Sequence, residues 1–208
     1  MYELIGSPDV QLDLLRLHRL ALADPASYAY LFLSAEQEIN GLRSGSSNGY
    51  HALGYEPGSG DLRDCVTCYL QSDLHRRPDY RLVFREMSPE RPGGSPRREL
   101  IAVRPRRGPG NIYQHVLARL HRHPDDLQPG LGVFGMRRSG RGGNEATRQA
   151  ELDAKRAIAL AYAGQVPLPT SRPFDPTSAG PSARDRFGRP VIPSVHKGRS
   201  TDSRVRHV

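Results

Sequence analysis

Apolar positions in the first 45 residues recur at helical spacing. The first periodic run begins at Asp9 and repeats every three or four residues, at Val10, Leu14, Leu17 and Ala21. This spacing predicts an amphipathic helix. Asp24 followed by Pro25 is typical of a helix N-cap and first position, and it opens a second run that ends in the glycines of residues 41–49. With a short strand over residues 2–5, the pattern predicts a strand followed by a helical hairpin.

In the middle of the chain, apolar and polar residues alternate with a period of two, as in β-strands. Residues 44–60 are rich in Gly and Ser and predict a loop, after which residues 65–70, 80–85 and 100–103 read as three strands. In the second strand Leu82 and Phe84 share one face, and the opposite face carries Arg81, Val83 and Arg85. The third strand is almost wholly apolar, which predicts a central position. Proline and glycine in residues 88–96 predict a long hairpin loop.

One more helix closes this core, and the pattern then weakens. Asn111 is typical of an N-cap, and the apolar positions after it predict a helix that ends at Pro124. Residues 144–164 are Ala-rich and predict a further helix, whereas seven prolines in residues 166–193 predict disorder. We therefore expect a folded domain at 1–125 and a basic, Gly/Pro-rich extension at 126–208. The fold class is α+β: an N-terminal helical hairpin packed on a small, mainly antiparallel sheet with a C-terminal helix, plus a long, largely disordered tail.

Charge is distributed unevenly along the chain. The net charge is +8, yet residues 1–125 hold 16 basic and 15 acidic side chains. Positive charge is nevertheless concentrated locally, since residues 97–122 contain seven arginines and Glu99 as their only acidic residue. A basic patch of this kind predicts a polyanionic partner.

Cys65 and Cys68 form a single C-x-x-C pair in a predicted strand. A strand sends positions three apart to opposite faces, which disfavours both a zinc site and a redox motif and predicts reduced, buried thiols. We therefore expect no metal and no cofactor. With no signal-peptide pattern at the N-terminus and no run of about 18 apolar residues, we expect a cytoplasmic protein without a membrane association.

The core resembles the RelE/ParE superfamily of type II toxins. The matching segments are Asp64-Cys65 at the start of a strand, the strand 80–85 with the sequence YRLVFR, and the stretch from Val103 to Leu120. That stretch carries Arg106 and Arg107 ahead of a helix that opens with Asn111, Ile112 and Tyr113. The resemblance covers about 60 residues by sequence and extends to the helical hairpin by the order of elements.

The resemblance implies a RelE-like mRNA interferase, an endoribonuclease that cleaves mRNA on the ribosome by attack of a 2′-hydroxyl on its own 3′ phosphate. Such a reaction needs alignment and cations where negative charge grows. The expected catalytic residues are Arg81, Arg106, Arg107 and Tyr113, although either Arg106 or Arg107 fits the family position. The expected substrate-binding residues are Tyr69, Tyr80, Arg85 and Arg104. A cognate acidic antitoxin is the expected protein partner.

One departure from the family keeps two other functions open. RelE carries two lysines on the strand after the Asp-Cys pair, where this chain has Thr67 and Tyr69. A phenol would need a lowered pKa to transfer a proton, so His75 or His115 is an alternative base. The alternatives are a non-catalytic, ParE-like inhibitor of DNA gyrase on the same fold and a non-toxic RNA-binding domain.

Overall fold

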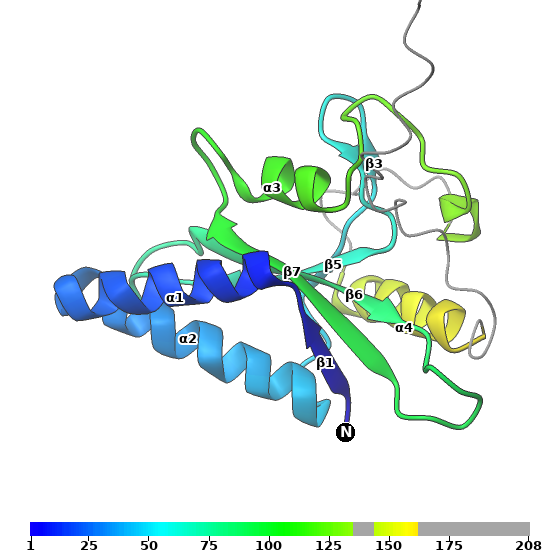
Figure 1. Cartoon of the computed structure of the whole chain (residues 1–208), viewed down its shortest axis with the longest axis horizontal. Coiled ribbons are helices and arrows are strands. Elements are labelled where there is room, and N and C mark those ends of the chain that lie inside the picture. Colours follow the sequence, from blue (N-terminus) through cyan, green and yellow to red (C-terminus); the bar gives the residue numbers. More distant parts are fainter. Residues whose placement is uncertain (135–143, 162–208) are drawn as a thin grey trace, which may run out of the picture. The chain divides into compact units, whose positions relative to one another are not determined.

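A five-stranded mixed sheet forms the centre of the fold (Figure 1). The structure is a computed structural model that describes residues 1–134 and 144–161, which belong to one compact unit. Its strand order is β1-β7-β6-β5-β2, with bounds Glu3–Gly6, Arg97–Pro105, Tyr80–Met87, Cys65–Leu70 and His51–Ala52. β1 runs parallel to β7, and the other pairs are antiparallel. The predicted α+β class and mainly antiparallel sheet are confirmed, and the apolar strand β7 is internal.

The helical hairpin covers one face of this sheet. It consists of α1 (Pro8–Ala23) and α2 (Pro25–Ser44). Asp24 caps α2 as predicted, since its carboxylate accepts a hydrogen bond from the Ser27 amide at 3.2 Å. Gly45, with φ of 88°, ends the helix in the left-handed region that glycine adopts without steric cost. Apolar residues of both helices pack on the sheet residues Val66, Cys68, Leu70, Leu82 and Phe84.

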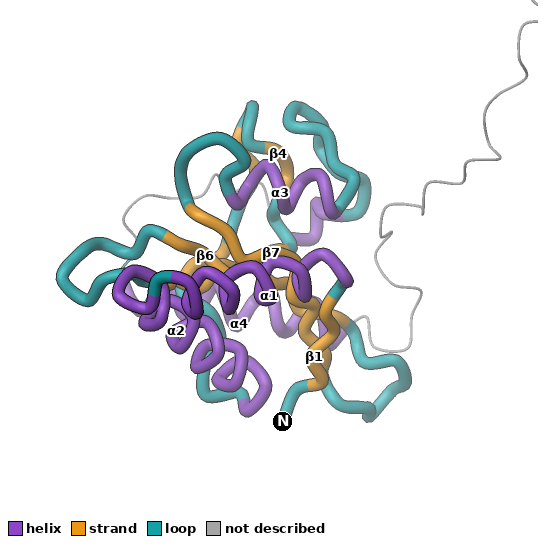
Figure 2. The backbone as a smooth tube through the Cα atoms, turned by 60° about the vertical axis from the view of Figure 1, so that its left-hand side comes forward, coloured by secondary structure: helices purple, strands orange, loops and turns teal. Residues whose placement is uncertain are grey.

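The opposite face of the sheet is covered by α3 (Ile112–Arg119) (Figure 2). The Asn111 side chain caps it as predicted, by accepting from the amides of Tyr113 and Gln114 at 3.1 and 3.2 Å. The helix does not continue to Pro124, so that predicted end is wrong. His121 adopts φ of 52°, and the Arg122 amide donates back to the Leu117 carbonyl at 2.9 Å. This is a Schellman ending with a non-glycine residue, which the sequence pattern does not reveal.

The segment predicted as a loop over residues 44–60 contains short strands. β2 pairs with β5, and β3 (Tyr55–Glu56) pairs with β4 (Gly60–Asp61) in a separate two-stranded sheet. Strands of two residues cannot display a period, so the pattern missed them. Gly60 lies against α3, and a Cβ there would come within 2.3 Å of a Leu117 methyl group. A glycine is therefore required where this hairpin meets the helix.

The helix predicted over residues 144–164 is present as α4 (Glu145–Ala161). It packs against β2, β6 and the short 3₁₀ helix η1 (Leu131–Phe134), and it buries Leu152, Lys155 and Ala159. The Ser88 hydroxyl also donates to the Ala159 carbonyl at 3.0 Å. The chain beyond residue 125 thus contributes a packed helix to the same unit as residues 1–125. The predicted disorder of residues 166–193 lies outside the described residues.

The two cysteines occupy opposite faces of the sheet, as predicted from their spacing. Cys65 belongs to the apolar cluster under α3, and Cys68 belongs to the cluster under the helical hairpin. Both are free, buried thiols, and burial raises the pKa of each. Neither is positioned as a nucleophile or as part of a shared metal site.

Candidate nucleic-acid interface

Two of the seven arginines in residues 97–122 pair with one buried carboxylate on α1. Asp13 accepts Arg104 Nη2 at 2.6 Å and Arg119 Nη1 at 2.7 Å, and it also accepts the Val103 amide at 3.1 Å. We call Asp13, Arg104 and Arg119 the Asp13 cluster. It links α1, β7 and α3, so Arg104, predicted to bind substrate, is held in a contact between elements of the fold.

A second group, the Asp64 cluster, consists of Asp64, Arg85, Glu99 and Arg122. Arg122 donates to both Asp64 oxygens at 2.7 Å, and Arg85 lies 3.5 Å from Asp64 and 2.5 Å from Glu99. Burial alone would raise the pKa of Asp64, but the hydrogen bonds and charge of Arg122, together with Arg85, lower it to about 2. Arg85, also predicted to bind substrate, is buried within this cluster.

The remaining basic residues of the stretch divide into buried and exposed pairs. Arg98 is fully buried and donates to the Leu42 carbonyl at 2.7 Å while pairing with Glu86 at 3.1 Å, and Arg97 pairs with Glu90. Arg106 and Arg107 are exposed, and neither has a carboxylate partner among the described residues. The prediction of one basic patch over residues 97–122 is therefore wrong, because five of its seven arginines are ion-paired with carboxylates within the described part of the chain.

Arg81 lies in a row of residues that crosses three strands. It is opposite Tyr69 on β5 and Arg104 on β7, on the face that α3 covers. Its side chain is only 3% exposed, its Nη1 donates to the carbonyls of Pro78 and Tyr80, and its Cζ lies 3.9 Å from the centre of the Tyr69 ring. The guanidinium therefore supports the tyrosine ring from within the fold.

The predicted catalytic residues Arg81, Arg106 and Tyr113 are close enough to interact electrostatically. Burial lowers the pKa of Arg81; the charge of Arg106 lowers it further, and Tyr113 and Tyr69 oppose that change. Tyr113 is half-buried in the first turn of α3, and the Arg106 amide bonds to the Asp79 carbonyl at 2.7 Å. Arg107 follows Arg106 in the same exposed segment. The structure thus brings Arg81, Tyr69, Tyr113 and Arg106 into one region.

The Tyr69 ring is also in contact with a second tyrosine that the sequence did not indicate. The rings of Tyr69 and Tyr50 have centroids 4.2 Å apart at an interplanar angle of 36°, and Arg148 Cζ of α4 lies 4.6 Å from the Tyr50 ring centre. Tyr50 is 44% exposed and Tyr69 is 36% exposed. We call Arg81, Tyr69, Tyr50 and Arg148 the Arg–Tyr stack. Both rings are partly exposed, and each has a guanidinium over it. Arg148 is also ion-paired with Glu145.

Tyr80 lies on the other side of the sheet. It packs against the cluster under the helical hairpin, and burial raises the pKa of its phenol. Adjacent strand residues point to opposite faces, so Tyr80 is separated from Arg81 although they are neighbours in sequence. Of the four predicted substrate-binding residues, Tyr69 is the one that the structure groups with the Arg–Tyr stack.

Groups that could transfer a proton are limited near the stack. Thr67 is buried in the sheet, and His75 is exposed in the loop before β6. Burial lowers the pKa of His115, as do Arg104 and Arg119, which places this imidazole next to the Asp13 cluster. In the described residues, the phenols of Tyr69 and Tyr113 are close enough to Arg81 to affect its pKa, and they are the candidate proton donors.

The described residues contain neither a metal-ligand group nor a helix that could span a membrane. No group of three or more His, Cys, Asp or Glu side chains in them could hold a metal ion, and none of their helices combines the length and apolarity that crossing a membrane requires. No protein-family model matches the chain, and comparisons with curated proteins and with solved structures find no similar protein. The Arg–Tyr stack, with Arg106 and Tyr113 near it, is therefore the candidate functional site.

Proposed function

We propose that this protein binds single-stranded RNA across the Arg–Tyr stack. The observation that carries the proposal is the contact between two exposed tyrosine rings, each with an arginine beside it. Proteins recognise unpaired RNA bases chiefly by stacking them on aromatic side chains and guanidinium planes, with nearby cations holding the phosphates. Tyr50 and Tyr69 are the stacking residues in this proposal, and the exposed Arg106 and Arg107 are the phosphate contacts. Arg148 pairs with Glu145 and supports the Tyr50 ring.

The finer proposal is that the protein is a RelE-like toxin that cleaves mRNA on the ribosome and is held inactive by an acidic antitoxin. It is supported by the sequence resemblance and by the proximity of Arg81, Tyr113 and Arg106. In the reaction the 2′-hydroxyl gives its proton to a solvent water and attacks the adjacent phosphorus. The bond to the 5′ oxygen breaks as that oxygen takes up the Tyr113 phenol proton, which solvent later restores. Arg106 stabilises the added negative charge, and Tyr113 is the proton donor. Arg81 does not contact the RNA in this proposal, because its guanidinium is buried. It contributes by supporting the Tyr69 ring.

Two features of the structure favour a function without RNA cleavage. Arg81 is 3% exposed, and the strand positions that carry lysines in RelE are a buried threonine and a tyrosine here. A binding protein without nuclease activity, such as a ParE-like inhibitor of DNA gyrase or a non-toxic RNA-binding domain, needs neither a free Arg81 nor a general base. These functions are the second candidates.

Inducible expression of the full chain in a bacterial host separates these functions. The toxin proposal predicts growth arrest with new mRNA 5′ ends inside translated codons. Tyr113→Phe removes only a hydroxyl and is expected to reduce cleavage by about 100-fold, the scale of one general acid. Tyr30→Phe, on the exposed side of α2, is the matched control and should cleave normally.

Two other outcomes would overturn the cleavage proposal, and a third would overturn the role of Tyr113 in it. Growth arrest with intact messages and altered DNA supercoiling would identify a gyrase inhibitor. Absence of arrest would leave an RNA-binding protein without toxicity. Equal cleavage by Tyr113→Phe and the unchanged protein would remove Tyr113 from the reaction.

A further inference from the structure

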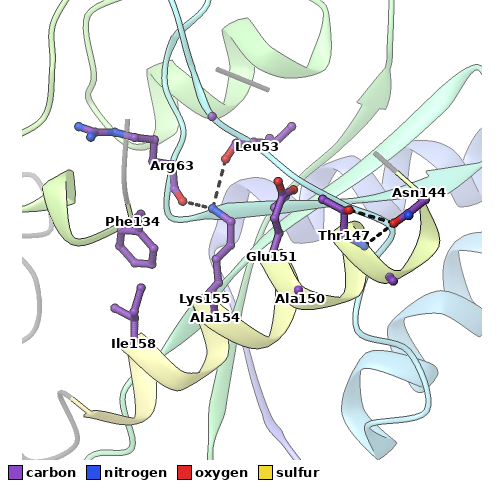
Figure 3. A pocket seen from close by; sticks show the side chains of 13 residues that line it. Leu53, Arg63, Phe134, Asn144, Thr147, Ala150, Glu151, Ala154, Lys155 and Ile158 are labelled. Carbon is purple, nitrogen blue, oxygen red and sulfur yellow. Dashed lines mark hydrogen bonds between the residues drawn. The ribbon is translucent and has the colours of Figure 1, made fainter. Parts of the chain in front are cut away.

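A cavity of about 590 Å³ lies beside α4, and none of the residues of the Arg–Tyr stack lines it (Figure 3). Its walls come from the end of β2, from η1 and from one side of α4, and they are largely apolar, with Leu53, Phe134 and Ile158 among them. This volume falls within the range of roughly 300–1,000 Å³ that is common for small-molecule sites. The cavity is therefore large enough to hold a small organic molecule.

Lys155 projects from α4 into this apolar setting. It is only 7% exposed, and its Nζ donates to the Leu53 carbonyl at 3.2 Å and to the Arg63 carbonyl (Figure 3). Burial lowers the pKa of Lys155 to about 8, although carboxylates nearby oppose the change. Lysine is scarce in the chain, which otherwise contains only Lys197. The titratable groups that surround this amine are His51, Asp61, Arg63, Asp64, Cys65 and Glu151.

Two features of the cavity favour a neutral ligand over an anion. Glu151 lines the same cavity one helical turn before Lys155, and the side chains face the same side of α4 (Figure 3). The Arg63 guanidinium is bound to both oxygens of Asp61, at 2.8 and 2.7 Å. A neutral amine has two N–H groups, which the two carbonyls satisfy, and its lone pair is then available to an electrophile.

We propose that Lys155 forms an imine with a small apolar aldehyde or ketone bound in this cavity. Lysines in apolar pockets are suited to this reaction because a fraction of the amine is neutral near physiological pH. The lone pair of Nζ attacks the carbonyl carbon, and a proton passes from nitrogen to oxygen to give a carbinolamine. The C–O bond then breaks, the oxygen leaves as water, and the carbon–nitrogen double bond forms. Glu151 carries the protons between nitrogen and oxygen, and no redox change occurs.

Reductive trapping of the folded full chain tests this proposal. The protein is incubated with benzaldehyde and sodium cyanoborohydride at pH 7.5, and peptide mass spectrometry follows labelling of Lys155, Lys197 and the N-terminal amine. At that pH an amine with a pKa near 8 is neutral on the order of 100 times more often than an ordinary lysine. Lys155 should therefore be labelled at least about tenfold faster than Lys197, with a rate that saturates as benzaldehyde increases.

Variants and conditions then identify the cause of the labelling. Urea should abolish the preference for Lys155, Lys197→Arg should leave it unchanged, and Glu151→Gln should slow labelling without changing the benzaldehyde concentration at half saturation. Labelling of Lys155 no faster than Lys197 in the folded protein would overturn the proposal, as would a rate that rises linearly with benzaldehyde. Protection of Lys155 by benzoate without any trapped imine would also overturn it and would identify an anion site.

Discussion

The arginines of the described residues serve two different purposes in two regions of the molecule. In the Asp13 and Asp64 clusters, guanidinium groups are buried or partly buried, bound to buried aspartates and placed where strands and helices meet. In the region of the Arg–Tyr stack, Arg106 and Arg107 are exposed and Arg148 lies over an exposed tyrosine. The same residue type thus holds the fold together in one region, whereas in the other Arg106 and Arg107 remain available to a ligand and Arg148 pairs with Glu145.

This difference shows that a count of basic residues is a poor guide to a binding surface. A buried carboxylate that neutralises an arginine removes its charge from the potential outside the protein. The tyrosines mark the candidate interface more clearly, because two partly exposed rings in contact are available for stacking with a base. Substitutions in the Asp13 and Asp64 clusters should therefore change the free energy of unfolding. Substitutions in the Arg–Tyr stack or at Arg106 and Arg107 should change the affinity for RNA.

The largest effect should come from Asp13. Asp13→Asn would leave Arg104 and Arg119, whose side chains are 20% and 12% exposed, without their buried charge partner. Breaking such a pair should cost about 3 kcal/mol, the lower end of the range for buried ion pairs. Urea unfolding of the variant should show this loss in the free energy of unfolding. Glu36→Gln on exposed α2 is the matched control and should change the free energy of unfolding by less than about 0.5 kcal/mol. An equal effect of the two substitutions would contradict a structural role for the Asp13 cluster.

A smaller effect is expected from acid titration of Asp64. Its pKa is about 2 in the folded protein, below the ordinary value of 3.8, so the unfolded chain takes up this proton first. The stabilisation is therefore fully present above about pH 4 and is lost as the pH falls toward 2, by about 2 kcal/mol. The free energy of unfolding between pH 5 and 2 should have a steeper slope in the unchanged protein than in Asp64→Asn. If the two proteins lose stability with the same slope, Asp64 has the same pKa in the folded and the unfolded chain, which would contradict this prediction.

The smallest effect should come from the exposed arginines. Arg106→Ala/Arg107→Ala should weaken binding of a single-stranded RNA by about tenfold at low salt and lower the slope of log affinity against log salt by about 1 to 2. Stability should be unchanged, because no carboxylate among the described residues pairs with either side chain. Arg16→Ala/Arg19→Ala on exposed α1 removes the same charge and is the control. If both double variants lose the same affinity, binding depends on net charge instead of this segment.

The fold was accessible from the sequence where local signals are strong. Asp24 and Asn111 identified two helix starts by their caps, and the alternation around Arg81 assigned each side chain to its face of the sheet. These signals depend only on neighbours along the chain. Where the ending was unusual, as at His121 in the left-handed region, the local pattern failed.

The site was harder to predict from the sequence because its contacts join segments that are far apart along the chain. Arg119 and Asp13 are 106 residues apart, so no local pattern could show that this arginine is neutralised. Tyr50 lies in a Gly/Ser-rich stretch and meets Arg148 only because α4 packs beside β2. The sequence therefore proposed Arg81, Arg106, Tyr113 and Tyr69 together with Tyr80, Arg85 and Arg104, which the structure places elsewhere, and it could not supply the second tyrosine of the stack.

RNA binding by the tyrosine pair is the most direct test of the account. A short, fluorescently labelled single-stranded RNA is titrated with the unchanged chain, with Tyr50→Ala/Tyr69→Ala and with Tyr30→Ala, whose tyrosine is similarly exposed on α2. We predict that the double variant binds at least about tenfold more weakly, since each stacked base contributes about 1–3 kcal/mol. Tyr30→Ala should bind as the unchanged chain does. Equal affinity for all three proteins, with the double variant folded, would contradict the proposal that this surface binds RNA.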